Sequence, residues 1–358
     1  MREVAAELKR LEAELSEVEV GRDELAATLP NLPDPDAPEG ETDADAVVLR
    51  EVGDRPTFDF ELRDHLDLGL AHGWIDMEKA AAASGSRFAY LLGDLVMVEL
   101  ALIRFAVELL GEEGFVPVVP PVLVREGPLY GTGVFPADSD MIYEAPQDEL
   151  FLVGTSEVSL AALHADEILD AGQLPRRYAG ISTCFRREAG AAGKDTRGIF
   201  RVHQFDKVEM FSFVLPDESR AEHERLLTIQ EQILAALELP YRVVDIPIGD
   251  LGAPAARKFD CEAWIPSQER YREVTSTSNT TDYQARRLGA RYRPQAEAQP
   301  EHVHTVNGTA VAVGRTLIAL LENRQRADGS VDLPAALVDA GAPEVIPSRP
   351  GRAQASTS

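Results

Sequence analysis

The second half of the chain contains several strand-like runs that follow one another without a helix between them. Neighbouring parallel strands need a long crossover, whereas antiparallel strands can be joined by short turns. The order therefore predicts an α+β domain with an antiparallel sheet flanked by helices, and it disfavours a doubly wound parallel sheet. The strand-like runs are Leu150–Val153, Tyr178–Phe185, Gln204–Val214, Tyr241–Ile246, Phe259–Ile265, Tyr271–Ser276 and His304–Val311, and the helix-like runs are Glu157–Ala171, Glu218–Leu237 and Gly314–Arg326.

An a/d heptad stripe runs through the highly charged residues 2–26, which are predicted to form a helix. Its apolar residues recur at alternating spacings of four and three, the pattern of a coiled coil. A single strand of a coiled coil is unstable alone, and no second heptad stretch follows. The partner helix is therefore missing from this chain or comes from another subunit. The stripe consists of Val4, Leu8, Leu11, Leu15, Val18 and Leu25.

The region between this helix and residue 150 has a less regular pattern. The proline-rich Pro30–Pro38 ends the helix, residues 39–56 are acidic and loop-like, and residues 60–83 read as short helices. An apolar helix is expected at Leu91–Leu110. Phe115–Val124 is rich in valine but holds three prolines, which predicts an edge or interface strand.

Composition narrows the classes of function. The chain has 35 Lys+Arg and 61 Asp+Glu, a net charge of −26, which argues against a protein that coats nucleic acid but leaves local basic patches open. Two cysteines, Cys184 and Cys261, exclude a disulfide scaffold, and no paired Cys/His spacing indicates zinc. No signal peptide and no long apolar span is present. The chain is therefore predicted to be cytoplasmic and not to bind membranes.

Charged residues stand inside several strand-like runs, where charge is normally rare. Phe185–Glu188 precedes a glycine-rich polar loop and a returning strand, so Arg186 and Glu209 are expected on paired strands of a hairpin. Further clusters occupy Arg270–Ser276 and Asn307–Thr316. Arginine binds phosphate in a bidentate manner, and glutamate with a hydroxyl can hold Mg²⁺ beside phosphates. The clusters predict a site for a polyanion and a divalent metal; the alternative is a set of ion pairs at the rim of the sheet.

Common short catalytic motifs do not account for this site. The sequence contains no GxxxxGK[ST], GxGxxG, GxSxG or HExxH, so the usual phosphate loops, the hydrolase nucleophile elbow and the zinc-protease helix are excluded. The long charged segments themselves are more informative. They read ISTCFRREAGAAGKDTRGIFRVHQFDKVEMF, VNGTAVAVGRTLIALLENRQRADGS, GFVPVVPPVLV, FLVGTSEVSLAALHADEIL and YREVTSTSNTTDYQARR.

These segments resemble the serine–tRNA ligases of the bacterial type, which are class II aminoacyl-tRNA synthetases. The first segment is similar to the second class II motif, the next to the third, and GFVPVVPPVLV to the first, which builds the dimer interface. The resemblance runs from about Pro30 to Leu337. It implies a class II catalytic domain at residues 60–342, a coiled-coil remnant at 1–29, a linker at 30–59 and a disordered tail at 343–358.

The resemblance also implies an activity. The enzyme would use ATP and Mg²⁺ to convert L-serine to seryl-adenylate and would transfer serine to tRNA(Ser), with tRNA(Sec) as a further candidate acceptor. It would form a homodimer through the helix Leu91–Leu110 and the proline-bearing strand. No protein nucleophile is needed, because the site positions two anionic reactants and neutralises their charge.

Site residues follow from the resemblance, position by position. Arg186 would bridge the serine carboxylate and the α-phosphate, while Phe205 and Arg315 would sandwich adenine. Glu273 and Ser276 would hold Mg²⁺. The implied catalytic residues are Arg186, Glu188 and Arg315; the serine site is Thr155, Ser156, Glu157, Arg186, Glu209 and Thr309; and the ATP site is Arg186, Arg187, Glu188, Val202, Phe205, Glu273, Val274, Thr275, Ser276 and Arg315.

The chain departs from the family's pattern at three places. Thr309 stands where many relatives carry Ser, and Thr280 stands where many carry Cys. The family's N-terminal arm, which grips tRNA, has two helices, and this chain retains one, with few basic residues for phosphate contacts. The chain would therefore be a fragment or a late-start product, a short enzyme that charges tRNA weakly, or a paralogue that loads seryl groups onto a non-tRNA acceptor.

Two other functions remain as alternatives. A non-catalytic regulatory protein on a synthetase fold should have lost its charged ATP-site residues, yet Arg186, Glu273 and Arg315 are present. A ligase for another small amino acid is compatible with the fold alone, but Glu209 and Thr309 favour serine over alanine or glycine.

Overall fold

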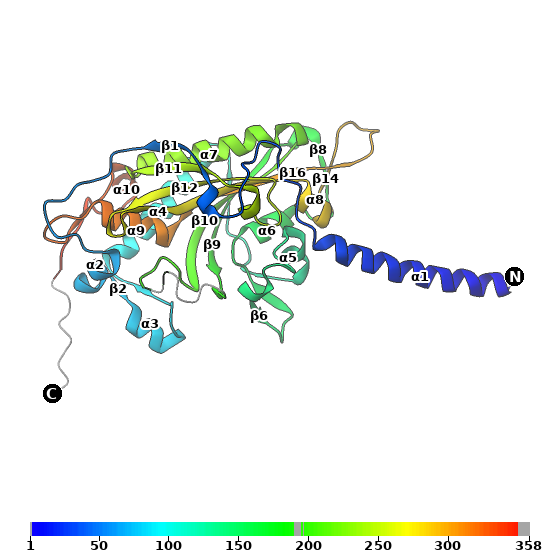
Figure 1. Cartoon of the computed structure of the whole chain (residues 1–358), viewed down its shortest axis with the longest axis horizontal. Coiled ribbons are helices and arrows are strands. Elements are labelled where there is room, and N and C mark those ends of the chain that lie inside the picture. The colour runs from blue at the N-terminus through cyan, green and yellow to red at the C-terminus, as the bar shows by residue number, and fades with distance from the viewer. Residues whose placement is uncertain (1, 190–194, 196, 350–358) are drawn as a thin grey trace.

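The computed structural model describes residues 2–189, 195 and 197–349 (Figure 1). An eight-stranded sheet forms its centre, and every pair in it is antiparallel except β4 with β9. The predicted α+β class with an antiparallel sheet is therefore confirmed. In spatial order the strands are β1 (Val47–Val52), β11 (Tyr241–Asp245), β12 (Arg257–Ile265), β13 (Arg270–Thr281), β16 (His304–Ala312), β10 (Gln204–Val214), β9 (Arg176–Phe185) and β4 (Val116–Val118).

The two faces of the sheet have different roles, as the alternation along β10 makes clear. Val208 and Met210 belong to the main core, which is closed by α4 (Asp94–Glu112), α7 (Ser219–Ala236) and α9 (Val313–Asn323). Successive side chains of a strand point to opposite faces, so Lys207 and Glu209 point away from these helices. The second face therefore carries polar side chains in its middle.

Smaller elements surround this second face. Phe211 and Phe213 continue it into a separate apolar cluster with α6 (Glu157–Ala161) and α8 (Tyr283–Leu288). The remaining elements are α2 (His65–His72), β2 (Ile75–Asp76), α3 (Met77–Ser84), β3 (Tyr90–Leu91), β5 (Leu123–Val124), α5 (Glu126–Thr132), β6 (Tyr143–Ala145), β7 (Leu150–Leu152), β8 (Ile168–Asp170), β14 (Arg291–Arg293), β15 (Glu301–His302), β17 (Val331–Asp332), α10 (Ala335–Asp339) and β18 (Val345–Ile346).

Helix α1 (Arg2–Ala27) projects from the body of the molecule, and its heptad stripe is exposed to solvent (Figure 1). Two contacts hold its root. Asn31 donates from its side-chain amide to the backbone oxygens of Pro254 and Thr280, each at 2.9 Å. Arg287 of α8 donates to the backbone oxygen of Ala27 at 3.1 Å. The root of α1 is thus attached to α8 and to the end of β13.

Some local predictions were wrong. The helix expected at Glu157–Ala171 ends at Ala161, because tertiary pairing of Ile168–Asp170 with β14 overrides the helical pattern. The acidic stretch 39–56 contains strand β1, which has no buried residue to mark it in the sequence. In the part of the chain that the structure describes, no helix is both long and apolar enough to cross a bilayer.

The prediction of a disordered tail at 343–358 was wrong for the first residues of that segment. Strand β18 pairs there with β17, and Ile346 is fully buried. Its remainder, 350–358, lies outside the described residues, as do 190–194 and 196 of the glycine-rich loop.

Candidate active site

A cleft opens on the polar face of the sheet. It lies between the end of β9, the segment that leads into β10, the middle of β13 and the first turn of α9. Of the predicted site residues it brings together eight, from segments far apart in the sequence. Its lining consists of Arg186, Glu188, Ile199, Phe200, Arg201, Val202, Phe205, Lys207, Glu273, Val274, Thr309, Ala312, Gly314 and Arg315.

Arg186 lies directly after β9 and is held from several sides. Its backbone N–H donates to the oxygen of His203 at 3.0 Å, and its Nε donates to the oxygen of Gly154 at 3.1 Å. Its guanidinium carbon is 5.3 Å from the ring centre of Phe205. These contacts fix Arg186 between the cleft and Thr155, so that one guanidinium can reach ligands on both sides.

Arg315, on the first turn of α9, lines the same cleft as Arg186. Its guanidinium lies 4.9 Å from the ring centre of Phe200, and Arg272 stacks on the same ring at 3.9 Å. A flat aromatic surface with cations over its face suits a planar heterocycle. The guanidinium of Arg315 therefore has both an aromatic and an anionic neighbour, the latter being Glu273.

Glu273, Ser276 and Asp260 meet at the β12–β13 pair. Glu273 and Ser276 are three residues apart and would point to opposite faces of a regular strand. A register shift between Cys261 and Glu262 in the pairing returns them to one face. Asp260 hydrogen-bonds the hydroxyl of Ser276, and its Oδ1 has no hydrogen-bond partner among the described residues.

The carboxyl groups of Glu273 and Asp260 titrate differently. Arg315 holds the pKa of Glu273 well below its ordinary value, against the opposing effect of burial. Burial raises the pKa of Asp260 to about 7, and the charge of Glu273 adds to this increase. Glu273 is thus a carboxylate at neutral pH, whereas Asp260 readily takes up a proton.

A second group of polar side chains lies below Arg186. Lys207 and Glu209 form a buried ion pair on β10, and Lys207 also donates to the Thr155 hydroxyl at 2.7 Å. Thr309, paired with Glu209 across β10 and β16, donates to its carboxylate at 3.2 Å. The group forms a strongly polar cluster at the edge of the cleft, which Lys207 and Thr309 also line.

Glu157, in the first turn of α6, lies close enough to Glu209 and Lys207 for their charges to act on it. One of its carboxylate oxygens, Oε1, accepts from the amides of Gln284 at 2.7 Å and Asn307 at 3.0 Å. Burial raises the pKa of Glu157 to about 7, and the nearby charge of Glu209 acts in the same direction. The amide donors favour the ionised form, so the group is balanced between its two protonation states near neutral pH.

Three predicted site residues lie elsewhere. Arg187 stacks over Tyr143, 5.4 Å from the ring centre, outside the cleft lining. Thr275 is buried on the core side of β13 beside Cys261. Ser156 is fully buried, and its Oγ has no hydrogen-bond partner in the described part of the chain.

Sequence reasoning missed six residues of the cleft lining, namely Ile199, Phe200, Arg201, Lys207, Ala312 and Gly314. Phe200 provides its aromatic wall, Arg201 donates to Glu188 at 3.2 Å, and Lys207 neutralises Glu209. A signal for Lys207 was available, because it stands two residues before Glu209 on a strand and so shares its face. Phe200 had no such signal, since it lies outside any strand.

Comparisons with known proteins agree with this geometry. Residues 141–324 match the family model described as tRNA synthetase class II core domain (G, H, P, S and T). The chain is 56% identical to a serine–tRNA ligase of Acidothermus cellulolyticus over 338 residues, which cover 94% of this chain and 80% of that protein. It is 51% identical to a serine–tRNA ligase of Rubrobacter xylanophilus over 346 residues, covering 96% and 81%.

A solved structure is similar over nearly the same extent. Seryl-tRNA synthetase from Pyrococcus horikoshii, complexed with ATP, aligns with a TM-score of 0.94 at 43% identity, covering 97% of this chain and 82% of that chain. The cytoplasmic serine–tRNA ligase of Naegleria fowleri in complex with AMP aligns with a TM-score of 0.89 at 33% identity, covering 95% and 82%.

Proposed function

The chain belongs to the serine–tRNA ligase family, and we propose that it activates L-serine with ATP to form seryl-adenylate and then transfers serine to the 3′ end of tRNA(Ser). The observation that carries this proposal is the adjacency of a cleft and a buried polar cluster. The cleft lined by Arg186, Phe205 and Arg315 suits a nucleotide. The polar cluster of Lys207, Glu209 and Thr309, of which Lys207 and Thr309 also line the cleft, suits a short polar amino acid. Arg186 lies between them.

In the first reaction a serine carboxylate oxygen attacks the α-phosphorus of ATP, and the bond to pyrophosphate breaks. Both reactants are anionic, so most of the catalysis comes from positioning them and neutralising their charge. We propose that Arg186 bridges the serine carboxylate and the α-phosphate of ATP. Phe205 and Arg315 would form the aromatic and cationic walls for adenine, and Glu188 would contact the adenosine side. Val202 and Val274 would pack against the nucleotide.

Selection of serine follows from the polar cluster. We assign Glu209 and Thr309 to the substrate hydroxyl, and Thr155 and Glu157 to its ammonium group. A site built to bond a hydroxyl rejects an analogue that lacks it, because its own buried polar groups then lose their partner. Alanine and glycine would therefore be disfavoured, and threonine would be opposed by the limited space beside the Thr309 methyl.

The residues present also fit a magnesium ion. Mg²⁺ prefers oxygen ligands and is commonly held by one or two carboxylates together with substrate phosphates. Glu273 remains anionic, Ser276 supplies a hydroxyl on the same face, and Asp260 adds an oxygen without a partner among the described residues. We propose that Glu273 and Ser276 hold Mg²⁺ when ATP is bound, where it would neutralise phosphate charge.

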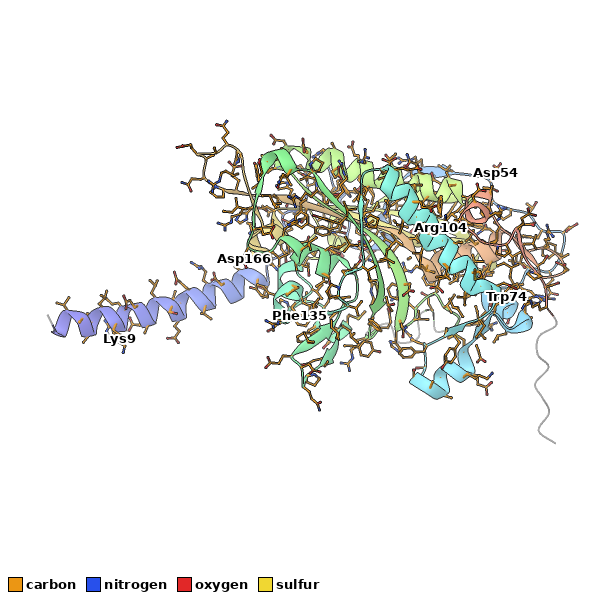
Figure 2. All side chains as sticks on the ribbon, turned by 180° about the vertical axis from the view of Figure 1, so that it is seen from behind. Lys9, Asp54, Trp74, Arg104, Phe135 and Asp166 are labelled. Carbon is orange, nitrogen blue, oxygen red and sulfur yellow. The ribbon has the colours of Figure 1, made fainter. Side chains whose placement is uncertain are left out.

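We further propose a homodimer formed through α4 and β4. Both carry large apolar side chains on the surface, with Leu100 of α4 55% and Val116 of β4 56% exposed. Figure 2 shows α4, marked by Arg104, running across the near side of the molecule. Strand β4 is the last strand of the sheet, so its outer edge is open to another chain. Such an exposed apolar surface is typical of a protein interface.

The domain assignment is part of the proposal. Residues 60–342 would form the catalytic domain, 1–29 would belong to a tRNA-binding coiled-coil arm, and 30–59 would link the two. We place the enzyme in the cytoplasm, in keeping with two buried free cysteines.

Serine-dependent exchange of pyrophosphate into ATP tests the first reaction. Serine should drive exchange at least about 100-fold more efficiently than alanine, glycine or threonine, a ratio within reach of a hydroxyl-bonding pocket. Charging of purified tRNA(Ser) with labelled serine tests the second reaction. Exchange driven equally by alanine would contradict the serine assignment, and exchange without charging would contradict the tRNA acceptor.

A further inference from the structure

Gln284, in the first turn of α8, is fully buried behind the proposed serine pocket. Its amide nitrogen donates to Oε1 of Glu157 at 2.7 Å. Its amide oxygen points the other way and accepts from the hydroxyl of Thr305 at 2.9 Å. The side chain therefore connects the carboxylate of Glu157 to a buried pair of hydroxyl groups.

The hydroxyl pair consists of Thr305 on β16 and Thr280 on β13. Their two oxygens lie 2.5 Å apart, and the Thr280 hydroxyl also donates to the backbone oxygen of Thr305 at 2.8 Å. Because the Thr305 proton is directed to Gln284, the Thr305 hydroxyl oxygen accepts from Thr280, whose single proton is shared between this oxygen and the backbone oxygen. The hydrogen bonds thus run in one direction, from Thr280 through Thr305 and Gln284 to Glu157.

The end of the amide that faces Glu157 matters for the charge of that residue. If Gln284 were turned over, its oxygen would face a carboxylate oxygen, and two acceptors would oppose each other unless Glu157 carried a proton. In the observed orientation the Thr305 hydroxyl donates to the amide oxygen of Gln284, which leaves the amide N–H for Glu157. Hydrogen bonds that run in one direction also strengthen one another.

We propose that Thr280, Thr305 and Gln284 form a positioning chain that keeps Glu157 ionised and oriented to bind the ammonium group of serine. The proposal rests on the proposed function, in which Glu157 lines the serine pocket. None of the three residues would touch substrate, and each would act through Glu157. Thr280 thereby gains a role: its hydroxyl supplies the donor at the start of the chain.

The charges around Glu157 make its protonation state sensitive to such a contact. Glu209 of β10 raises its pKa, while Lys207 of the same strand and Arg186 after β9 lower it. The two amide donors, Gln284 and Asn307, are neutral and stabilise the carboxylate. With opposing charges already present and a pKa of about 7, the loss of one amide donor should move the protonation midpoint of Glu157 upward.

The test measures kcat/KM for serine against pH in pyrophosphate exchange at saturating ATP, which reports groups in the serine-free enzyme. Thr305→Val removes the hydroxyl at nearly constant volume, and Thr280→Val combined with it removes both donors. We expect the midpoint of the profile to rise by about one pH unit, and kcat/KM for serine to fall about tenfold on the acidic side. The KM for ATP should remain within about twofold of wild type.

Controls separate this effect from general damage to the core. Thr305→Ser restores the donor and should restore the wild-type midpoint. Thr132→Val makes the same substitution at a buried threonine whose hydroxyl bonds only backbone oxygens of its own helix, and it should leave the midpoint unchanged. If Thr305→Val does not fold, Gln284→Met breaks the chain at its other end and should raise the midpoint in the same way.

The outcomes distinguish the two proposals. Serine-dependent exchange by wild type, with an unshifted midpoint in both Thr305→Val and Gln284→Met, overturns the positioning chain and leaves the proposed function standing. An equal rise in the KM for serine and for ATP also overturns it, because that pattern indicates a structural role only. Absence of serine-dependent exchange in wild type overturns the proposed function and the positioning chain with it.

Discussion

The guanidinium of Arg315 lies 2.9 Å from the carboxylate of Glu273 and donates at 3.1 Å to the backbone oxygen of the same residue. One side chain of α9 is therefore attached to β13 at both the main chain and the side chain. This arrangement fixes the cationic wall of the cleft relative to the proposed metal ligand. It also explains the contrast between Glu273, which stays ionised, and Asp260, which takes up a proton more readily.

Replacing Arg315 with Lys should disrupt this geometry while keeping the charge. A lysine cannot stack on a ring and donate two fixed hydrogen bonds in the same way. We expect kcat/KM for ATP to fall by about 100-fold in pyrophosphate exchange, in the range seen when one fixed donor is removed from a charged site. Arg326→Lys changes an exposed ion pair beyond the end of α9 and should have no effect. Equal values of kcat/KM for ATP in the two variants would contradict the assignment of Arg315 to the nucleotide site.

Arg186 and Arg187 offer a matched pair of neighbours. Arg186→Ala should abolish detectable adenylate formation and leave the fold intact, because its guanidinium faces the cleft and neutralises developing charge. Arg187→Ala should reduce the rate of adenylate formation by no more than about threefold, since Arg187 is exposed and the substitution removes only its cation–π contact with Tyr143. Circular dichroism and pyrophosphate exchange measure both. A large loss in Arg187→Ala would restore the sequence-based assignment of that residue to the ATP site.

Glu209→Gln should weaken serine more than ATP. The substitution removes the charge that pairs with buried Lys207 and changes the group proposed to read the substrate hydroxyl. We expect the KM for serine to rise at least about tenfold, with the KM for ATP changing by less than about twofold. Glu231→Gln, which breaks the ion pair with Arg50 on the far edge of the sheet, serves as the control. Equal increases for serine and ATP would argue against Glu209 as the serine reader.

The buried His223 should make folding sensitive to acid. Burial lowers its pKa to about 4, and its ring stacks on Phe259 while Nε2 donates to the Thr277 backbone oxygen. Between about pH 6.5 and pH 4 the unfolded state binds the proton and the folded state does not, so stability falls as pH is lowered. The loss amounts to at most about 3 kcal/mol.

Urea unfolding at pH 7 and pH 5 tests this expectation. His223→Phe keeps the stacked ring but cannot titrate, so its free energy of unfolding should change less between the two pH values than that of wild type. The comparison concerns the change with pH, since the variant also loses a hydrogen bond. The same change in both proteins would exclude His223 as a source of acid sensitivity.

The proposed dimer can be tested on α4. Leu100→Glu places a charge in the exposed apolar surface and should convert a dimer to a monomer at micromolar concentration, as measured by sedimentation. Leu70→Glu places the same charge at an exposed leucine of α2 (51% exposed), outside this surface, and should remain dimeric. A dimeric Leu100→Glu variant, or a monomeric wild type, would contradict the interface.

How far the sequence predicts the fold depends on where each element finds its partners. The strands β9 and β10 were predictable because their own alternation and charges mark them. Strand β1 was not, because its six exposed residues are stabilised only by pairing with β11. The short strand β8 was mistaken for helix for the same reason. Local pattern identifies elements that bury one face, and it fails for those defined by a distant neighbour.

The residues of the site divide in the same way, into those that a local sequence pattern marks and those that it does not. Arg186, Glu273 and Arg315 stand in charged strand or helix segments, and their grouping in one cleft agrees with the motif-based prediction. Arg187 and Thr275 were included because the family resemblance implied them, but adjacent residues on extended backbone point in opposite directions. Gln284, Thr280 and Thr305 could not be recognised at all, since a buried hydrogen-bond chain among neutral side chains has no sequence signature.

The attachment of α1 through Asn31 and Arg287 has a mechanical consequence. A straight helix of 26 residues is roughly 39 Å long, and Lys9 near its free end lies far from the rest of the molecule (Figure 2). A tilt of about 10° around the root moves that end by roughly 7 Å. The root of α1 is hydrogen-bonded to α8 and to the end of β13. A displacement of the outer end of α1 therefore acts at its root on α8, the helix that carries Gln284.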